Sequence, residues 1–268
     1  MSKNTAAIIE KWYHRLGFDP KWDVDFYAYL KEIPISEDTA IEDYDVSCED
    51  GRKNLMAYLY MCEALERKYN EMGISREIFD DTVKDLVIWS DVWSELKNQL
   101  WIGEIGWLKN HLSAELFKLG RLQFAIQYFE EDCPDYGIKK GECNIGIHIA
   151  ALGPLTPESC KASLVQANAF FAKYFPEISY DYYTCHSWLL DDTLKQLLPE
   201  TSNILHFADM FKKISADPSE DIFKYVFRWD TRRHNLAEAN APTSFAQRVK
   251  DFALKGNEFY IVTGIREK

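Results

Sequence analysis

The sequence predicts an α+β protein, in which a helical first part is followed by a mixed sheet flanked by helices. Two observations carry this prediction. Before residue 118, apolar residues recur at helical spacing without any long alternating stretch, and after it alternating segments are separated by helical patterns. We therefore expect a helical domain over 1–117 and an α/β domain over 118–268, both of ordinary size.

Amphipathic helices account for most of the first part. Ile8, Trp12 and Leu16 recur every four residues and form one apolar stripe. A second helix is expected to end at Gly73, and Ser75 can cap the next one. The expected helices cover 4–18, 52–72, 76–93 and 107–117.

Alternating residues mark the strands of the second part. Leu122, Phe124 and Ile126 alternate with polar neighbours, and Ile145 and Ile147 do the same in the next segment. Strands are expected over 119–129, 143–151, 178–191, 202–214 and 257–267.

The best-specified helix of the second part follows the second strand. Thr156 can cap it, and Pro157 suits the first helical position. One buried stripe is expected to contain Cys160, Leu164, Ala167, Phe171 and Tyr174. Shorter helices are expected over 191–198, after Ser219, and from Thr243 to Gly256.

Composition argues against several functional classes. The net charge of −12, from 31 Lys+Arg against 43 Asp+Glu, repels a phosphate backbone, so no nucleic-acid partner is expected. The six cysteines form no CxxC pair, and no apolar run approaches membrane-spanning length. Because the start of the chain also lacks a signal-peptide pattern, we expect free thiols, no membrane association and a cytoplasmic location.

Four stretches together resemble a known family. They are "DTVKDLVIWSD" (81–91), "LGRLQF" (119–124), "IHIAALGPLTPESC" (147–160) and "CHSWLL" (185–190). In this order they resemble bacterial acyltransferase-like proteins that pair an N-acyltransferase N-terminal domain with a GNAT-like C-terminal domain. The resemblance covers nearly the whole chain and implies a GNAT-like, mixed and twisted sheet over the second part.

The resemblance also implies a chemistry. In GNAT-like acyltransferases, the strand 143–151 would end in the loop that holds a pyrophosphate, and the strand 181–190 would lie parallel to it and splay away. The splay exposes backbone groups that can bind the amide arm of a coenzyme A thioester. Acyl-CoA would then be the co-substrate, with a small-molecule amine as acceptor, direct transfer, and no metal.

The turn after the second strand departs from the Gly-rich loop of that superfamily. Pro154 and Pro157 have no N–H to offer an anion, and Glu158 adds a negative charge to the first helical turn. Two interpretations therefore stand, a pyrophosphate site and a purely structural turn. The candidate cofactor-binding residues are Gly153, Leu155, Thr156, Ser159 and Ser187.

Three residues are candidate catalytic groups. His148 lies on the polar side of its strand just before the turn and is the preferred base, while His186 can contact the thioester or the acceptor. Tyr183 can protonate a thiolate leaving group. The structural alternatives are histidines hydrogen-bonded within the fold and a tyrosine packed in the core. Cys185 faces away from His186 and is expected to be a core thiol.

A metal site is not expected. His148, His186 and His206 fall on three different predicted strands, so a ligand set across the sheet is conceivable. No carboxylate lies at ligand spacing beside them, which argues against it.

Two functions from different classes follow. The first is an N-acyltransferase that moves an acyl group from an acyl-CoA to an amine, with His148 as base and the turn 153–159 near the pyrophosphate. The alternative is a non-catalytic binding or interaction protein that retains the GNAT-like fold. The sequence does not indicate an oligomeric state.

Overall fold

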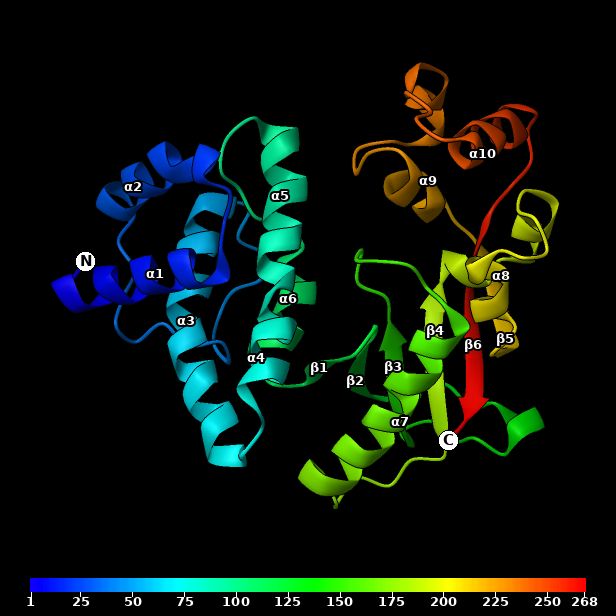
Figure 1. Ribbon diagram of the computed structural model, residues 1–268, viewed down its shortest axis with the longest axis horizontal. Helices are drawn as coiled ribbons and strands as arrows, with labels where there is room; N and C mark the ends of the chain where they lie inside the picture. The colour runs from blue at the N-terminus through cyan, green and yellow to red at the C-terminus, as the bar shows by residue number, and fades with distance from the viewer. The chain divides into compact units, whose positions relative to one another are not determined.

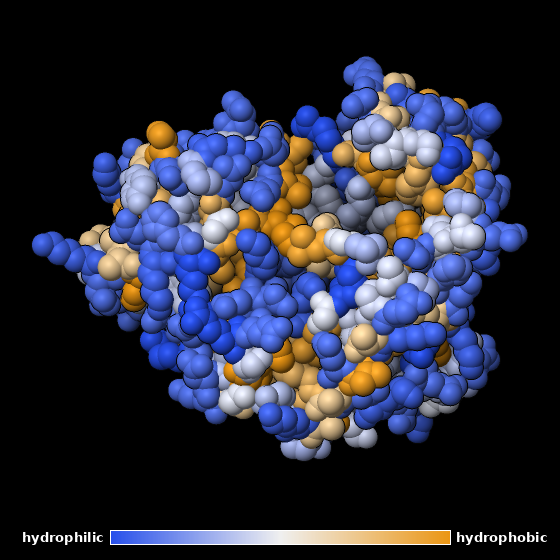
Figure 2. Space-filling view, viewed as in Figure 1, coloured by the Kyte–Doolittle hydropathy of each residue, from blue (hydrophilic) through white to orange (hydrophobic).

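The chain forms two compact units, Met1–Lys118 and Leu119–Lys268, in a computed structural model that describes residues 1–268 (Figure 1). Hydrophilic side chains cover most of the visible face of each unit, in keeping with the excess of acidic residues (Figure 2). None of the helices combines the length and the apolar character that crossing a lipid bilayer requires.

The first unit is helical, as predicted. Ser2 and Ser75 cap the helices that follow them, and Gly73 ends the longest helix at a φ of 70°. Its core contains Trp12, whose ring lies 5.5 Å from that of Phe79. The helices are α1 Lys3–Leu16, α2 Asp23–Glu32, α3 Gly51–Met72, α4 Arg76–Val83, α5 Asp85–Lys97 and α6 Ile105–Leu112, with a 3₁₀ turn at Pro20–Trp22.

Several details of the first unit correct the sequence prediction. The helix expected from Ser75 through Trp93 is interrupted at Lys84. Just before the break, the Thr82 hydroxyl donates to the carbonyl of Ile78 and accepts from a backbone N–H outside the helix, and such back-bonding favours a bend. The helix expected over 107–117 ends at Leu112, and α2 was not predicted.

The sheet is mixed, with the strand order β1-β2-β3-β4-β6-β5, and all its strands except β1 lie within the second unit. The pairs β2–β3, β4–β6 and β5–β6 are antiparallel, and β3–β4 is parallel. This confirms the predicted α+β class. The strands are β1 Leu116–Leu119, β2 Leu122–Tyr128, β3 Cys143–His148, β4 Tyr182–Ser187, β5 Lys212–Pro218 and β6 Tyr260–Glu267.

Helix α7 (Pro157–Tyr174) lies across one face of the sheet, in front of β3 and β4 in Figure 1. The Thr156 hydroxyl accepts from the Ser159 N–H, which confirms the predicted cap. Cys160, Leu164 and Phe171 are buried, as their spacing predicts. Because α7 precedes β4, the β3–α7–β4 segment is a crossover between two parallel strands.

A second core lies among the remaining helices of this unit. Phe223 and Phe259 pack edge to face at its centre, 5.9 Å apart. The elements around it are α8 Asn203–Ala208, α9 Asp221–Val226, α10 Ser244–Leu254 and the 3₁₀ segments Trp188–Leu190, Asp192–Gln196 and Arg233–Glu238. A further 3₁₀ turn covers Pro134–Tyr136.

One strand prediction was wrong, and another extended too far at its start. The segment 202–214 is not a strand: Ser202 caps the helix α8, and only its last residues enter β5. Leu205 and Ala208 are buried three positions apart, which is helical spacing in a short apolar run. The strand expected over 119–129 is divided by Gly120, whose φ of 67° makes the turn between β1 and β2.

Candidate functional site

The candidate site lies where β3 and β4 stop pairing. Their parallel ladder contains only two pairs, Ile145 with Tyr183 and Gly146 with Thr184. Both strands continue beyond it, β3 to His148 and β4 to Ser187. We call residues 147–148 of β3 and 185–187 of β4 the strand opening. The two strands are neighbours in the sheet, but these residues do not pair with one another.

The two candidate histidines occupy equivalent places in this opening. His148 is two residues beyond Gly146, and His186 is two residues beyond Thr184. Because side chains alternate between faces, both histidines project to the same face of the sheet as those two residues. The register therefore places one histidine on each side of the strand opening.

His186 is exposed, and a neighbouring strand holds its ring. Its Nδ1 lies 2.8 Å from Oγ1 of Thr263, the residue that faces it in the β4–β6 ladder. In the tautomer protonated at Nδ1, that nitrogen donates to the threonine hydroxyl and Nε2 carries a lone pair. This arrangement is the one required of a general base.

His148 is half-buried and is contacted from β2. The Gln127 side-chain amide donates to His148 Nε2, 3.3 Å away. Gly146 makes this contact possible, because a Cβ at that position would lie 2.2 Å from Gln127 Oε1. In this contact Nε2 accepts, as it does in the tautomer that carries the proton on Nδ1.

Tyr183 lies on the other face of the sheet, with α7. It is buried, its hydroxyl donates to Asn168 Oδ1 at 2.9 Å, and the hydroxyl of Tyr180 is 3.1 Å away. Burial, together with the Tyr180 contact, raises the pKa of Tyr183 well above its ordinary value. The structure therefore does not bring Tyr183 together with the two histidines.

Cys185 and Ser187 share the face of Tyr183 by alternation. Burial raises the pKa of the Cys185 thiol to about 12, which suits the expected core thiol rather than a nucleophile. The Ser187 hydroxyl accepts from the N–H of Leu189 and caps the 3₁₀ segment after β4. It has thus a structural role at the end of the strand.

Residues 149–156, which we call the β3–α7 loop, lead into the predicted cofactor-binding turn 153–159 and are largely exposed. Gly153 has a φ of 65°, and Leu155 is buried. The hydroxyls of Thr156 and Ser159 are used within the helix cap. The N–H groups of Gly153, Leu155 and Glu158 make no hydrogen bond within the chain and can serve a ligand.

Sequence reasoning missed a cation at this loop. Arg121, in the turn before β2, donates from all three guanidinium nitrogens to the backbone carbonyls of Ala150, Gly153 and Pro154, at 3.1, 3.2 and 3.1 Å. The arginine belongs to the "LGRLQF" stretch that carries the family resemblance. The family resemblance therefore includes Arg121, but its contact with the loop arises only from the packing of the β1–β2 turn.

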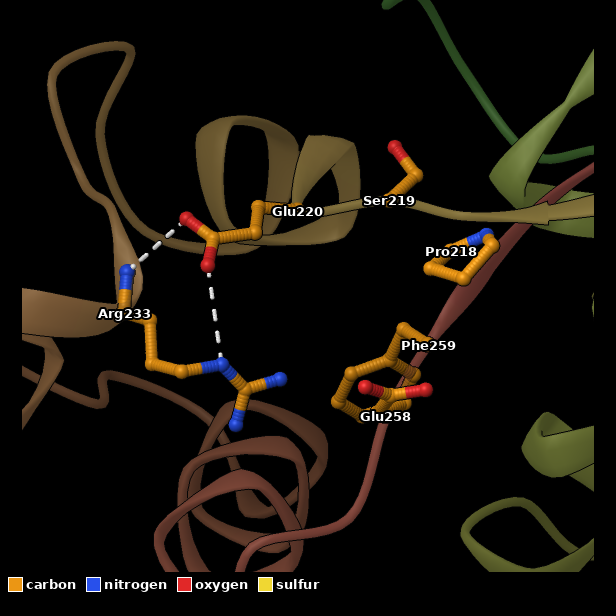
Figure 3. A pocket seen from close by; sticks show the side chains of 6 residues that line it. All are labelled: Pro218, Ser219, Glu220, Arg233, Glu258 and Phe259. Atoms are coloured by element: carbon orange, nitrogen blue, oxygen red, sulfur yellow. Dashed lines mark hydrogen bonds and ion pairs between the residues drawn. The ribbon is translucent and has the colours of Figure 1, made fainter.

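One pocket of about 190 Å³ lies elsewhere in the second unit, at the junction of β5, α9 and β6. Figure 3 shows Glu220 facing Arg233 across it, with Glu258 and Phe259 alongside. Glu220 accepts from the Arg233 backbone N–H at 3.1 Å and pairs with its Nε at 3.5 Å. Pockets for drug-sized ligands measure roughly 300–1,000 Å³, so this cavity is too small for acyl-CoA.

The structure shows no group of three or more His, Cys, Asp or Glu side chains arranged to hold a metal. His206 lies on α8 rather than on a strand, so the three histidines considered as a ligand set do not line one sheet.

Comparison with protein families confirms the resemblance found in the sequence. Residues 116–266 match the family described as the GNAT-like C-terminal domain, and residues 9–114 match the N-acyltransferase N-terminal domain. The first match alone spans more than half of the chain. No curated protein shows a significant match.

Solved structures of acyltransferases share the fold. One is in complex with decanoyl-CoA and teicoplanin, another is a mutant in complex with octanoyl-CoA, and a third is in complex with CoA and 10C-teicoplanin. Each is 26% identical to this chain with a TM-score of 0.71. The similarity covers 80% of this chain but only 66% of each of those chains.

Proposed function

The chain belongs to the family of proteins with a GNAT-like C-terminal domain, and we propose that it is an acyltransferase that uses an acyl-CoA donor. The observation that carries this proposal is the strand opening, with one histidine on each side of it on the same face. The acyl-CoA bound by the similar acyltransferases supports the same donor here.

In the proposed complex, the amide arm of the donor lies along the strand opening. Its pyrophosphate lies at the β3–α7 loop and the start of α7, where Gly153 and Leu155 of the loop and Glu158 of the helix offer backbone N–H groups. Thr156 and Ser159 contribute by capping α7, and Ser187 by ending β4. This assignment replaces a Gly-rich loop by a small number of outward N–H groups.

His186 is the proposed general base. As the acceptor nitrogen, in its neutral amine form, attacks the thioester carbonyl, Nε2 takes one proton from that nitrogen, and Nδ1 keeps donating to Thr263. The tetrahedral intermediate then collapses with cleavage of the C–S bond. Coenzyme A leaves as the thiolate and takes up the proton from the imidazolium, so an amide and a free thiol are formed.

His148 is the second candidate base, because it faces the same side of the sheet. To take a proton, its Nε2 would exchange the hydrogen bond from Gln127 for one from the acceptor. Tyr183 has no part in this mechanism, since it is buried on the α7 face. The leaving thiolate is therefore protonated by the imidazolium and not by a phenol.

The acceptor is proposed to be a small-molecule amine. The teicoplanin complexes of the similar acyltransferases support a small-molecule acceptor. The net charge of −12 favours a cationic acceptor over an anionic one. Six free cysteines support a reducing compartment, as in the cytoplasm.

The proposal is tested by binding followed by turnover. Decanoyl-CoA at one hundred times its Kd should stabilise the protein by about 2.7 kcal/mol in thermal unfolding. Amine acceptors are then screened for release of free CoA thiol. Absence of any stabilisation by decanoyl-CoA or CoA would sink the proposal. Saturable binding without thiol release to any amine would favour the alternative, a binding protein that retains the fold.

A further inference from the structure

Arg121 differs from an ordinary surface arginine in what it contacts. Its Nε, Nη1 and Nη2 each donate to a backbone carbonyl of the β3–α7 loop, from Pro154, Ala150 and Gly153. No carboxylate lies within ion-pair distance of it. A positive charge without a counter-charge therefore lies directly against the loop, in a protein whose net charge is −12.

Because peptide groups are planar, these contacts also determine the direction of the N–H groups in the loop. All peptide bonds are trans, so each N–H points opposite to the carbonyl it shares a peptide with. The carbonyls of Ala150 and Pro154 point at Arg121, and the N–H groups of Ala151 and Leu155 consequently point away from it. Neither N–H makes a hydrogen bond within the chain.

The backbone of Arg121 is itself fixed to α7. The N–H groups of Arg121 and Leu122 both donate to the hydroxyl of Ser163, at 2.7 and 3.2 Å. Ser163 is fully buried, and a Cβ at Gly120 would lie only 2.9 Å from its hydroxyl oxygen. The turn before β2, the loop and the helix that follows it are thus tied into one unit.

We propose that Arg121 is a positioning residue that aims the N–H groups of the β3–α7 loop at the diphosphate of the acyl-CoA donor. The inference rests on the proposed function and adds a residue to its donor site. The fork-shaped guanidinium binds several carbonyls at fixed angles, and a lysine ammonium cannot reproduce this. The arginine thus takes the role of the glycines of a Gly-rich loop, which is to present backbone N–H groups to the diphosphate.

The test compares the binding of CoA and pantetheine, which lacks the phosphates, by calorimetry. Wild-type protein should bind CoA more tightly. Arg121→Lys keeps the charge but loses the fork, and it should reduce the CoA-to-pantetheine affinity ratio by about tenfold or more, the value of one charge-assisted hydrogen bond. Pantetheine affinity should stay unchanged, because the amide arm lies in the strand opening.

Lys161→Gln is the matched control. Lys161 is exposed on the first turns of α7 and forms no hydrogen bond or ion pair with the loop, so its substitution mainly removes one nearby charge. A ratio lowered equally by Lys161→Gln would show a general charge effect and overturn the positioning role. A wild-type ratio in Arg121→Lys would overturn it too, as would an equal loss of CoA and pantetheine binding.

The proposed function and this inference fail in different ways. If wild-type protein binds neither CoA nor decanoyl-CoA, the acyltransferase proposal itself fails. If wild-type protein binds CoA and pantetheine equally, the donor is accepted but its phosphates do not lie at the loop, and the positioning role is wrong. If Arg121→Lys does not fold, Ser163→Ala is used instead, because it removes the hydroxyl that fixes the backbone of Arg121. An unchanged CoA-to-pantetheine affinity ratio in Ser163→Ala would overturn the inference.

Discussion

The two faces of the second unit's sheet contrast sharply, although the same strands build both. On the α7 face, Phe124, Ile145 and Tyr183 are buried and packed. On the other face, His186 is exposed and His148 half-buried, and both have polar neighbours. Because side chains alternate, residues that stabilise the fold and residues proposed to act on substrate are immediate neighbours in sequence.

This contrast teaches that the two kinds of residue can be separated by experiment. Substitution of an exposed side chain on the histidine face, such as His186, should change turnover and leave stability nearly constant. A substitution on the α7 face should do the reverse. Single substitutions on each face test this separation.

The largest effect is expected from His186→Gln. Glutamine keeps a hydrogen-bonding group toward Thr263 but cannot take the proton from the acceptor, so turnover should fall by about 10²–10⁴-fold. The melting temperature should change little, because the ring is exposed. Initial rates of thiol release and thermal unfolding measure the two quantities.

His206→Gln serves as the control, since His206 is exposed on α8 and should leave turnover unchanged. Full activity in His186→Gln, together with a large loss in His148→Gln, would transfer the role of base to His148. A strong drop in melting temperature in His186→Gln would contradict the separation of the two faces.

Phe124→Ala should give the largest loss of stability on the α7 face. The ring is fully buried and packs at a steep angle on Tyr183, 5.9 Å away. Removal of a buried phenylalanine costs about 3–5 kcal/mol in the free energy of unfolding. Urea unfolding should show this loss, and the turnover number per folded molecule should stay within about twofold of wild type. A specific loss of turnover would show that the faces are coupled.

The sequence predicts those elements of the fold that depend on residues close together in the chain. The helices α1, α3 and α7 follow from their caps and apolar spacing, which neighbouring residues determine. The segment 202–214 was wrong because a short apolar run fits both periods, and its packing decides between them. The antiparallel or parallel pairing of the strands likewise depends on the whole fold.

The candidate site divides in the same way. Both histidines were found from sequence, since polar residues on alternating strands are visible there. Strand alternation also separates Tyr183 from His186, which lie three positions apart, so its place on the other face could have been predicted. The contact of Arg121 with the β3–α7 loop could not, because residues about 30 positions apart meet only through tertiary packing.

A smaller effect is expected from Gly146→Ala on the histidine face. The new methyl group would lie 2.2 Å from Gln127 Oε1 and would displace the amide from His148. We expect a loss of about 1–3 kcal/mol in the free energy of unfolding from overpacking. In a Gln127→Ala background the clash partner is gone, so Gly146→Ala should then cost much less. An equal loss of unfolding free energy in both backgrounds would mean that the Gln127 side chain does not lie against Gly146.

The smallest effect is expected from Tyr183→Phe, and its sign changes with pH. At pH 8 the variant loses a hydrogen bond to Asn168, which costs about 1 kcal/mol. Burial raises the pKa of Tyr183 in the folded protein, whereas the unfolded chain ionises near pH 10. Above pH 10 the unfolded state therefore loses a proton that the folded state keeps, and this residue lowers wild-type stability by about 1.4 kcal/mol per pH unit.

Phenylalanine has no such proton, and the tyrosines that do not contact Tyr183 affect both proteins equally. The difference in unfolding free energy between wild type and Tyr183→Phe should thus shrink above pH 10 and vanish about one pH unit higher. Urea unfolding of both proteins between pH 8 and pH 11 measures it. Turnover at pH 8 should be equal in the two proteins, because the phenol lies on the α7 face. A constant stability difference up to pH 11 would mean that Tyr183 ionises in the folded protein, and lower turnover would return it to the mechanism.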